Sequence, residues 1–264
     1  MTSPRRVHQR PPTVLLVLAA VAVLLFVLPL VGLLSRTPWS RLGELLKSDL
    51  VLDALRLSFI SSLLAALIAT LLGVPLAWVL ARVDFPGRSL VRAIVTLPMV
   101  LPPVVGGAAL LFALGRTGLV GPPLEAIGIV LPFSLSGVVL ANVFVALPFL
   151  VITVEGALRS TDIRYEQAAE SLGASRLTVF RRITLPTIRP SLIAGIVLAW
   201  ARALGEFGAT ITFAGNLQGD TQTLPLAVFV SLDSDRDAAV AISLLLVAIS
   251  LVVLVALRDR WWRS

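Results

Sequence analysis

The sequence predicts an all-α, polytopic membrane protein with six transmembrane helices, and three observations lead to this fold class. Hydrophobic residues make up 57% of the 264 residues, whereas charged residues make up only 14%. The mean hydropathy is +0.96, a value typical of a chain that lies mostly in lipid. Six apolar runs are each long enough to cross a bilayer as a helix, which takes about 20 residues.

The six runs follow one another in what we expect to be a single transmembrane domain over residues 1–264. We predict that every run is helical, because backbone groups in lipid must form their hydrogen bonds within the segment. The first run follows Arg5, Arg6 and Arg10, as in a signal peptide. The apolar run is too long for a signal peptide, so we expect a retained span. The predicted spans are 14–34, 54–81, 92–115, 135–157, 191–215 and 238–257.

Basic residues are divided unevenly between the two sides of the predicted membrane. Fifteen arginines fall in segments on the same side as the N-terminus, and six basic residues fall in segments on the opposite side. Cytoplasmic loops carry an excess of lysine and arginine, so both termini and the segment 158–190 are predicted to be cytoplasmic. The remaining cation, Arg202, lies within a span.

Several kinds of chemistry are excluded by residues that the chain lacks. It has no cysteine, which excludes disulfides and thiolate metal sites. His8 is the single histidine, so we predict no metal site. Lys47 is the single lysine, and no Gly-x4-Gly-Lys-Ser/Thr motif occurs, so the chain has no phosphate-binding loop for nucleotide hydrolysis. The net charge of +7 comes with arginines at membrane boundaries, which indicates lipid contact and no nucleic-acid partner.

The cytoplasmic segment 158–190 is predicted to begin with a short amphipathic helix. Its apolar residues recur at i, i+3, i+4 and i+7, and so form one stripe. Thr161 or Asp162 caps its start, and Gly173 follows its end. A stripe of this kind in water needs a cover. We expect a partner protein to supply it, the alternative being that the segment lies on the inner leaflet. The stripe consists of Tyr165, Ala168, Ala169 and Leu172.

A second short helix is predicted to start at Ser175, which caps it, and to end at Pro186, because proline removes a backbone donor. The resulting helix–glycine–helix bracket favours docking into a groove over lying flat on the membrane. Glu166 and Glu170 would also be repelled by anionic headgroups. The residues on one side of the second helix are Val179, Phe180 and Ile183.

The same segment resembles the EAA signature of permease subunits of ATP-binding cassette (ABC) importers. Gln167-Ala168-Ala169 is followed after three residues by Gly173, after nine more by Ile183, and then by Leu185-Pro186. The departure is Gln167, where the general pattern has glutamate. The resemblance implies the type I ABC importer permease fold, a non-catalytic chain without cofactors, and two copies of a partner subunit that bind ATP and Mg²⁺. It assigns docking on that subunit to Glu166, Gln167, Ala168, Ala169, Gly173, Ile183, Leu185 and Pro186.

A second region is similar to the fifth span and following loop of molybdate permeases. It runs through Ala201–Thr210 and Phe213–Asn216 to Thr221–Pro225. Sulfate and thiosulfate permeases share an Arg-x-x-Gly-Glu core, so sulfate or tungstate remains an alternative cargo. The resemblance implies a homodimer in the cytoplasmic membrane of a bacterium or archaeon, supplied by an extracytoplasmic molybdate-binding protein. A secondary transporter and a structural membrane subunit are the competing classes.

Candidates for the translocation path lie in the third and fifth predicted spans. Arg202 and Glu206 are four residues apart and so share a helix face, with Thr210 one turn further on. Ionisable groups in a span usually face the interior of the bundle or water. The alternative is a mutually neutralising pair that packs helices together. Pro98 and Pro102 distort the third span, which indicates either cavity lining or a kink.

Overall fold

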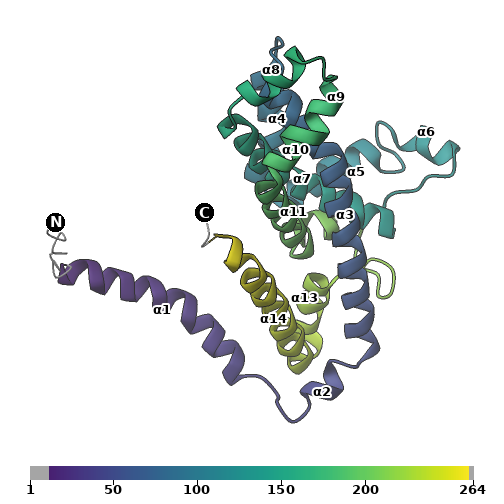
Figure 1. Ribbon diagram of the computed structural model, residues 1–264. Coiled ribbons are helices and arrows are strands. Elements are labelled where there is room, and N and C mark those ends of the chain that lie inside the picture. Colours follow the sequence, from purple (N-terminus) through teal and green to yellow (C-terminus); the bar gives the residue numbers. More distant parts are fainter. Residues whose placement is uncertain (1–11, 262–264) are drawn as a thin grey trace, which may run out of the picture.

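The computed structural model describes residues 12–261, with side chains through residue 255, and every regular element within that range is helical (Figure 1). The first two predicted spans are confirmed as helices α1 (Thr13–Ser35) and α3 (Asp49–Arg82), joined through α2 (Leu42–Leu45). Helix α1 has no buried residue and reaches away from the remaining helices (Figure 1).

The third predicted span, 92–115, in which the prolines were expected to distort the helix, is divided into two helices. Helix α4 (Arg88–Val100) and helix α5 (Pro103–Leu114) meet at 120°. Leu101 and Pro102 both precede a proline, whose ring excludes the helical region for the residue before it. They adopt extended backbone angles, with ψ of 132° and 129°. The bend is therefore dictated by two consecutive prolines.

Helix α7 (Leu135–Ser160) covers the fourth predicted span. It forms the centre of the bundle, because α3, α4, α5, α11 and α12 all pack on it. The core between α3 and α7 is built from small residues of α3 facing aliphatic residues of α7. Small side chains allow helix backbones to approach closely where lipid provides no hydrophobic drive. The buried residues of this core include Ala65, Ala69, Ala77, Val143, Ala146, Leu150 and Val154.

The fifth run, 191–215, is also interrupted, which corrects the prediction of one helix. Helix α11 (Arg189–Leu204) is followed by a break at residues 205–207 and by the short helix α12 (Gly208–Phe213). Helix α13 (Leu224–Ser234) was not predicted; its 11 residues are too few to span a bilayer. Helix α14 (Arg236–Trp261) covers the last predicted span. The remaining five elements are short. One is α6 (Gly121–Ala126), which follows α5, and the other four lie in the segment 158–190: α8 (Arg164–Ser171), α9 (Arg176–Val179), η1 (Phe180–Thr184) and α10 (Leu185–Thr187).

Within residues 12–261, four uninterrupted helices and up to two bent pairs are therefore long and apolar enough to cross a membrane. The predicted placement of both termini in the cytoplasm stays a prediction. Part of the charge pattern behind it lies outside the side chains that the structure describes, namely Arg5, Arg6, Arg10, Arg258, Arg260 and Arg263; His8 lies outside them as well.

Candidate functional site

The predicted helix–glycine–helix bracket is present at one end of the bundle (Figure 1). Asp162 caps α8, since its Oδ1 accepts the backbone N–H of Arg164 at 3.0 Å. Gly173 adopts the left-handed region, with φ of +87°, at the end of α8. Its N–H donates to Glu170 O, and the next N–H donates to Ala169 O, which completes a Schellman cap. The bracket is thus fixed by its own backbone.

The second half of the bracket differs from the prediction at Pro186. Ser175 caps α9 by accepting the N–H of Thr178 at 3.3 Å, as expected. The chain then forms the π-turn η1 and continues helically through Pro186, so proline does not end the helix. A widened turn removes the clash between the proline ring and the carbonyl one turn earlier. The helical course ends at Ile188, where the chain bends by 77° into α11.

The apolar stripe of α8 has no cover within the described chain. Tyr165 is 68% exposed and Leu172 is 90% exposed, Ala168 is exposed, and Ala169 is half-buried. Gln167 is also exposed. An apolar patch left in water is destabilising and marks an interaction surface. The exposed stripe is therefore a candidate docking surface.

The other side of the bracket packs on the bundle. Phe180 contacts Trp78 of α3 edge to face, with ring centroids 6.3 Å apart. Ile188 is buried in the main core, and Leu185 packs against that core. Ile183 is half-buried, whereas Pro186 is exposed. Of the residues assigned to coupling, those before Gly173 therefore mostly face outward, and those after it partly anchor the segment.

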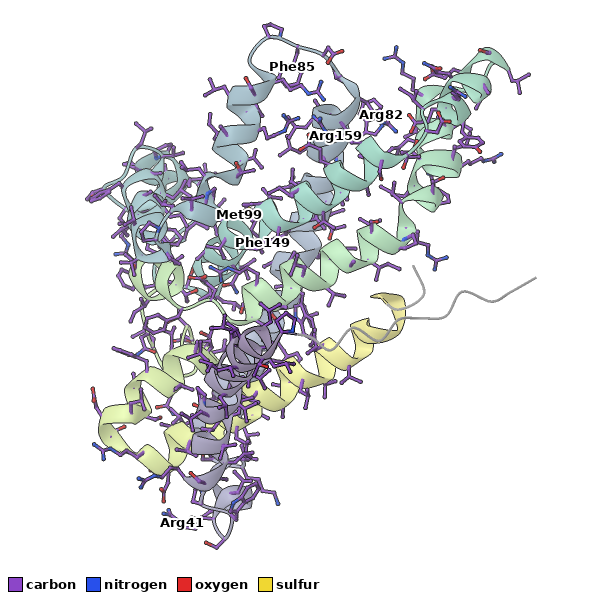
Figure 2. The ribbon with its side chains drawn as sticks, turned by 90° about the vertical axis from the view of Figure 1, so that its left-hand side faces the viewer. Arg41, Arg82, Phe85, Met99, Phe149 and Arg159 are labelled. Carbon is purple, nitrogen blue, oxygen red and sulfur yellow. The ribbon has the colours of Figure 1, made fainter. Side chains whose placement is uncertain are left out.

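Glu166 is the exception on α8, because it points inward and is buried. Its two carboxylate oxygens accept hydrogen bonds from Arg82 at the end of α3, from Nη2 at 2.9 Å and from Nε at 3.1 Å. The two side chains are 11% and 9% exposed. A bidentate arginine–carboxylate pair fixes both distance and orientation. The pair thus connects α8 rigidly to a helix of the bundle (Figure 2 labels Arg82 at this end).

Sequence reasoning missed Arg82. The available signal was that Arg82 and Glu166 have opposite charge and fall on the same predicted side. Several other arginines and carboxylates share that side, so charge alone did not identify the pair.

The second candidate site is the break in the fifth span. Glu206 is 2% exposed, and its Oε2 lies 2.6 Å from Nη1 of Arg202. Its Oε1 accepts the backbone N–H of Ala209 at 2.7 Å and so caps α12. The predicted face-sharing of Arg202 and Glu206 is confirmed. The carboxylate is fully engaged by these partners, which favours a structural pair over a bare anion ligand.

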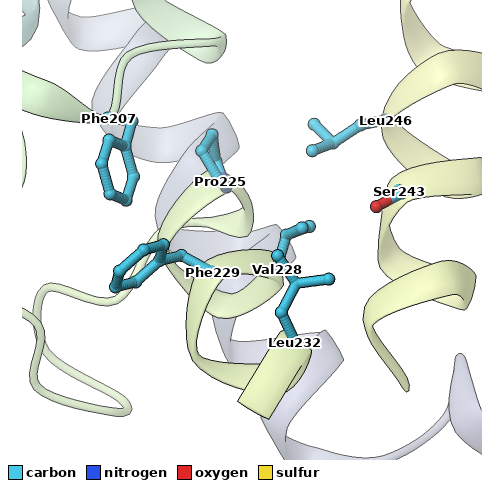
Figure 3. A pocket seen from close by; sticks show the side chains of 7 residues that line it. All are labelled: Phe207, Pro225, Val228, Phe229, Leu232, Ser243 and Leu246. Carbon is cyan, nitrogen blue, oxygen red and sulfur yellow. The ribbon is translucent and has the colours of Figure 1, made fainter. Parts of the chain in front are cut away.

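Phe207, in the same break, packs on Phe229 of α13 with ring centroids 5.2 Å apart. The two rings contribute to an apolar hollow of about 400 Å³ between α13 and α14 (Figure 3). Thr210 is fully buried, and its hydroxyl lies 3.5 Å from Asn142 Oδ1, while Asn142 Nδ2 donates to Ser61 at 3.3 Å. Thr210 therefore joins a polar chain that crosses from α12 through α7 to α3.

The structure brings the two broken spans together through α5 and α12. A Cβ added at Gly107 would lie 2.7 Å from the carbonyl oxygen of Ala209, and one added at Gly208 would lie 2.8 Å from Cβ of Pro103. The two short helices are thus in backbone contact. Pro102 forms the N-terminal boundary of α5, whereas Pro98 lies within α4, which packs on α7.

Within the described residues, the chain is thus a helical bundle with two interrupted spans, and the exposed stripe of α8 is a candidate surface for a partner protein. Residues 69–263 match the family model described as "Binding-protein-dependent transport system inner membrane component". The chain belongs to this family, and it is therefore a multi-pass protein of a prokaryotic inner membrane and a transport component.

Among its relatives, the molybdenum transport system permease protein ModB of Mycobacterium tuberculosis is 48% identical over 229 residues, which cover 85% of this chain and 87% of that protein. ModB of Escherichia coli is 41% identical over 79% of this chain and 92% of its own length. The bacterial ABC transporter whose title describes import of the acidic polysaccharide alginate has the same fold, with a TM-score of 0.78 over 95% of this chain and 94% of its own, at 21% identity.

Proposed function

We propose that this chain is the membrane-spanning subunit of an ABC importer that carries molybdate across the inner membrane, with ATP hydrolysed on a separate subunit. The observation that carries the cargo assignment is the 48% identity to a molybdenum permease over 85% of this chain. A sulfate transport system permease protein CysT of Salmonella typhimurium is 36% identical over 79% of the chain, so sulfate is the second candidate.

The exposed stripe on α8 supports docking on an ATP-binding subunit. Tyr165, Ala168 and Leu172 stand on one face at helical spacing, which suits a helix laid into a hydrophobic groove. Two copies of the chain around a two-fold axis would present two such stripes to two ATP-binding subunits. The binding protein would deliver the oxyanion at the opposite end of the molecule, where Figure 2 labels Arg41. The exposed Arg41, just before α2, pairs there with Asp237 of α14.

In this mechanism, closure of the ATP-binding subunits moves α8, and the Arg82–Glu166 pair transfers the movement to α3. The α4–α5 bend and the α11–α12 break supply joints in the membrane where short helices can re-pack. Alternation between inward-open and outward-open states needs two packings of similar energy, biased by nucleotide and binding protein. Arg202 and Glu206 would act at one of these joints, and Thr210, Pro98 and Pro102 near them.

The test is reconstitution of the permease with its ATP-binding subunit and binding protein in liposomes. Molybdate, tungstate and sulfate are compared for stimulation of ATP hydrolysis and for uptake. We expect molybdate to stimulate most strongly at the lowest concentration. Stimulation by sulfate alone would replace the cargo assignment, and ATP-independent uptake would contradict the transporter class.

A further inference from the structure

A basic hollow lies between α4 and α7, at the end of the bundle that carries α8 and α9. Its volume is about 500 Å³. Figure 2 labels one of its lining residues, Arg159, at the same end as Arg82 and opposite Arg41. Residues of both helices line the hollow, among them Arg92, Thr96, Glu155, Gly156 and Arg159.

Two arginines in this wall share one carboxylate. Arg92 Nε and Arg159 Nε donate to the same Oε1 of Glu155, at 3.1 and 2.9 Å. The Nη2 atoms of both arginines lie 3.5 Å from the carbonyl oxygen of Leu80 at the end of α3. Within the described part of the chain, neither arginine has a second carboxylate partner. The cluster therefore carries one surplus positive charge.

The geometry leaves hydrogen-bond donors directed away from Glu155. The Glu155 side chain is 7% exposed, but those of Arg92 and Arg159 are 35% and 47% exposed. Their Nη1 groups donate to no residue that the structure describes. Guanidinium groups bind planar or tetrahedral oxyanions through such unused N–H pairs.

The hollow also has room beside the two guanidiniums. A Cβ added at Gly156 would meet no atom within 4 Å, so the helix surface is open at this point. The Thr96 hydroxyl donates its hydrogen to the carbonyl oxygen of Arg92 at 3.0 Å. The lone pairs of the Thr96 hydroxyl oxygen therefore form part of the polar lining of the hollow. An ion pair whose sole role was to join α4 to α7 would need one arginine to neutralise Glu155. It would need neither the second arginine nor the open space beside it.

We propose that this hollow binds a tetrahedral oxyanion through Arg92 and Arg159. Basic pockets between transmembrane helices on the cytoplasmic side are known as binding places for phospholipid headgroups. The same chemistry fits a free oxyanion at the inner mouth of the transporter. The lipid source is independent of the proposed function, whereas the free-anion source rests on it.

The experiment uses the purified permease complex with its ATP-binding subunit and without the binding protein. Native mass spectrometry measures retained phosphatidylglycerol, and equilibrium binding of radioactive molybdate measures the free anion. Arg159→Gln removes the surplus charge while keeping the Arg92–Glu155 pair. Gly156→Leu fills the hollow while keeping both arginines. Arg164→Gln is the matched control, because its side chain is 87% exposed on α8.

Wild-type protein is expected to bind one of the two probes saturably. Both Arg159→Gln and Gly156→Leu should weaken that binding about tenfold or more, equivalent to about 1.4 kcal/mol, and Arg164→Gln should leave it within about twofold. Loss of lipid adducts identifies a headgroup site, and loss of molybdate binding identifies a free-anion site. Saturable binding of neither probe, or wild-type binding by both hollow variants, overturns the proposal. Molybdate uptake in the reconstituted system is scored separately, so a failure here leaves the proposed function standing.

Discussion

The bidentate pair between Arg82 and Glu166 yields the most direct prediction about mechanical coupling. Both side chains are about 10% exposed, at 9% and 11%, and two hydrogen bonds of 2.9 and 3.1 Å join them. Removing one partner of such a buried pair costs about 3–5 kcal/mol, because the other charge stays buried without compensation. We therefore expect Glu166→Ala to favour detachment of α8 from α3 by about two to three and a half orders of magnitude, since 1.4 kcal/mol corresponds to about tenfold.

Two measurements check this expectation. Hydrogen–deuterium exchange should show faster exchange in α8 of the Glu166→Ala variant, and proteoliposomes should import less molybdate per ATP hydrolysed. Glu170→Ala is the control, because Glu170 is an exposed carboxylate on the same helix. The exchanged pair Arg82→Glu with Glu166→Arg should recover part of both losses. If Glu166→Ala showed the same hydrogen–deuterium exchange in α8 and the same molybdate import per ATP as Glu170→Ala, the Arg82–Glu166 pair would not be a mechanical link.

Three more outcomes are expected. Gly107→Leu places a Cβ 2.7 Å from a backbone carbonyl oxygen of α12, so it should lower the stability of the protein in detergent by about 1–3 kcal/mol, measured by thermal unfolding. Gly156→Ala is the control, because its Cβ meets no atom within 4 Å and should leave the stability unchanged. Equal melting temperatures of the two variants would disprove the backbone contact. Gly173→Val forces a β-branched residue to φ of +87° and should lower uptake per ATP at unchanged membrane levels; normal uptake would count against the docking role of α8. Glu206→Gln leaves the charge of Arg202 without a partner within a span, which costs about 2.5–3.5 kcal/mol of insertion free energy. The amount of the variant in the membrane should therefore fall, and it should recover when Arg202→Gln is added. An unchanged amount would contradict the ion pair.

The sequence was sufficient for elements whose signal is local. The apolar runs of α1, α3, α7 and α14 are continuous, so length and hydropathy locate them. The caps at Asp162, Gly173 and Ser175 follow from short-range hydrogen bonding and backbone freedom, and all three are present.

Features that depend on tertiary packing were not accessible in the same way. Pro98, Pro102 and Pro103 indicate a distortion of this run, but the sequence alone does not give the angle of 120° between α4 and α5 or the contact of α5 with α12. The break after Leu204 is stabilised by Glu206, which caps α12 and pairs with Arg202 at once. No local sequence pattern predicts that Glu206 both caps α12 and pairs with Arg202. Helix α13 was missed because its 11 residues are too few to span a bilayer and include Ser231, Asp233 and Ser234, so the sequence did not distinguish it from a loop between spans.

The ion pair of Arg82 with Glu166 illustrates the same limit for the candidate site. The residues are 84 positions apart, so their contact depends on the packing of the α8 segment beside the end of α3. The exposed stripe, in contrast, was predictable in position from its spacing, and the structure adds that the chain itself leaves Leu172 uncovered.

One measurement tests most directly whether the α8 stripe is a docking surface for an ATP-binding subunit. A photoreactive amino acid is incorporated at Leu172 and irradiated in cells that contain every subunit of the transporter, and the adducts are identified by mass spectrometry. The account predicts that the main adduct joins this chain to the ATP-binding subunit. Adducts with phospholipid alone would contradict it.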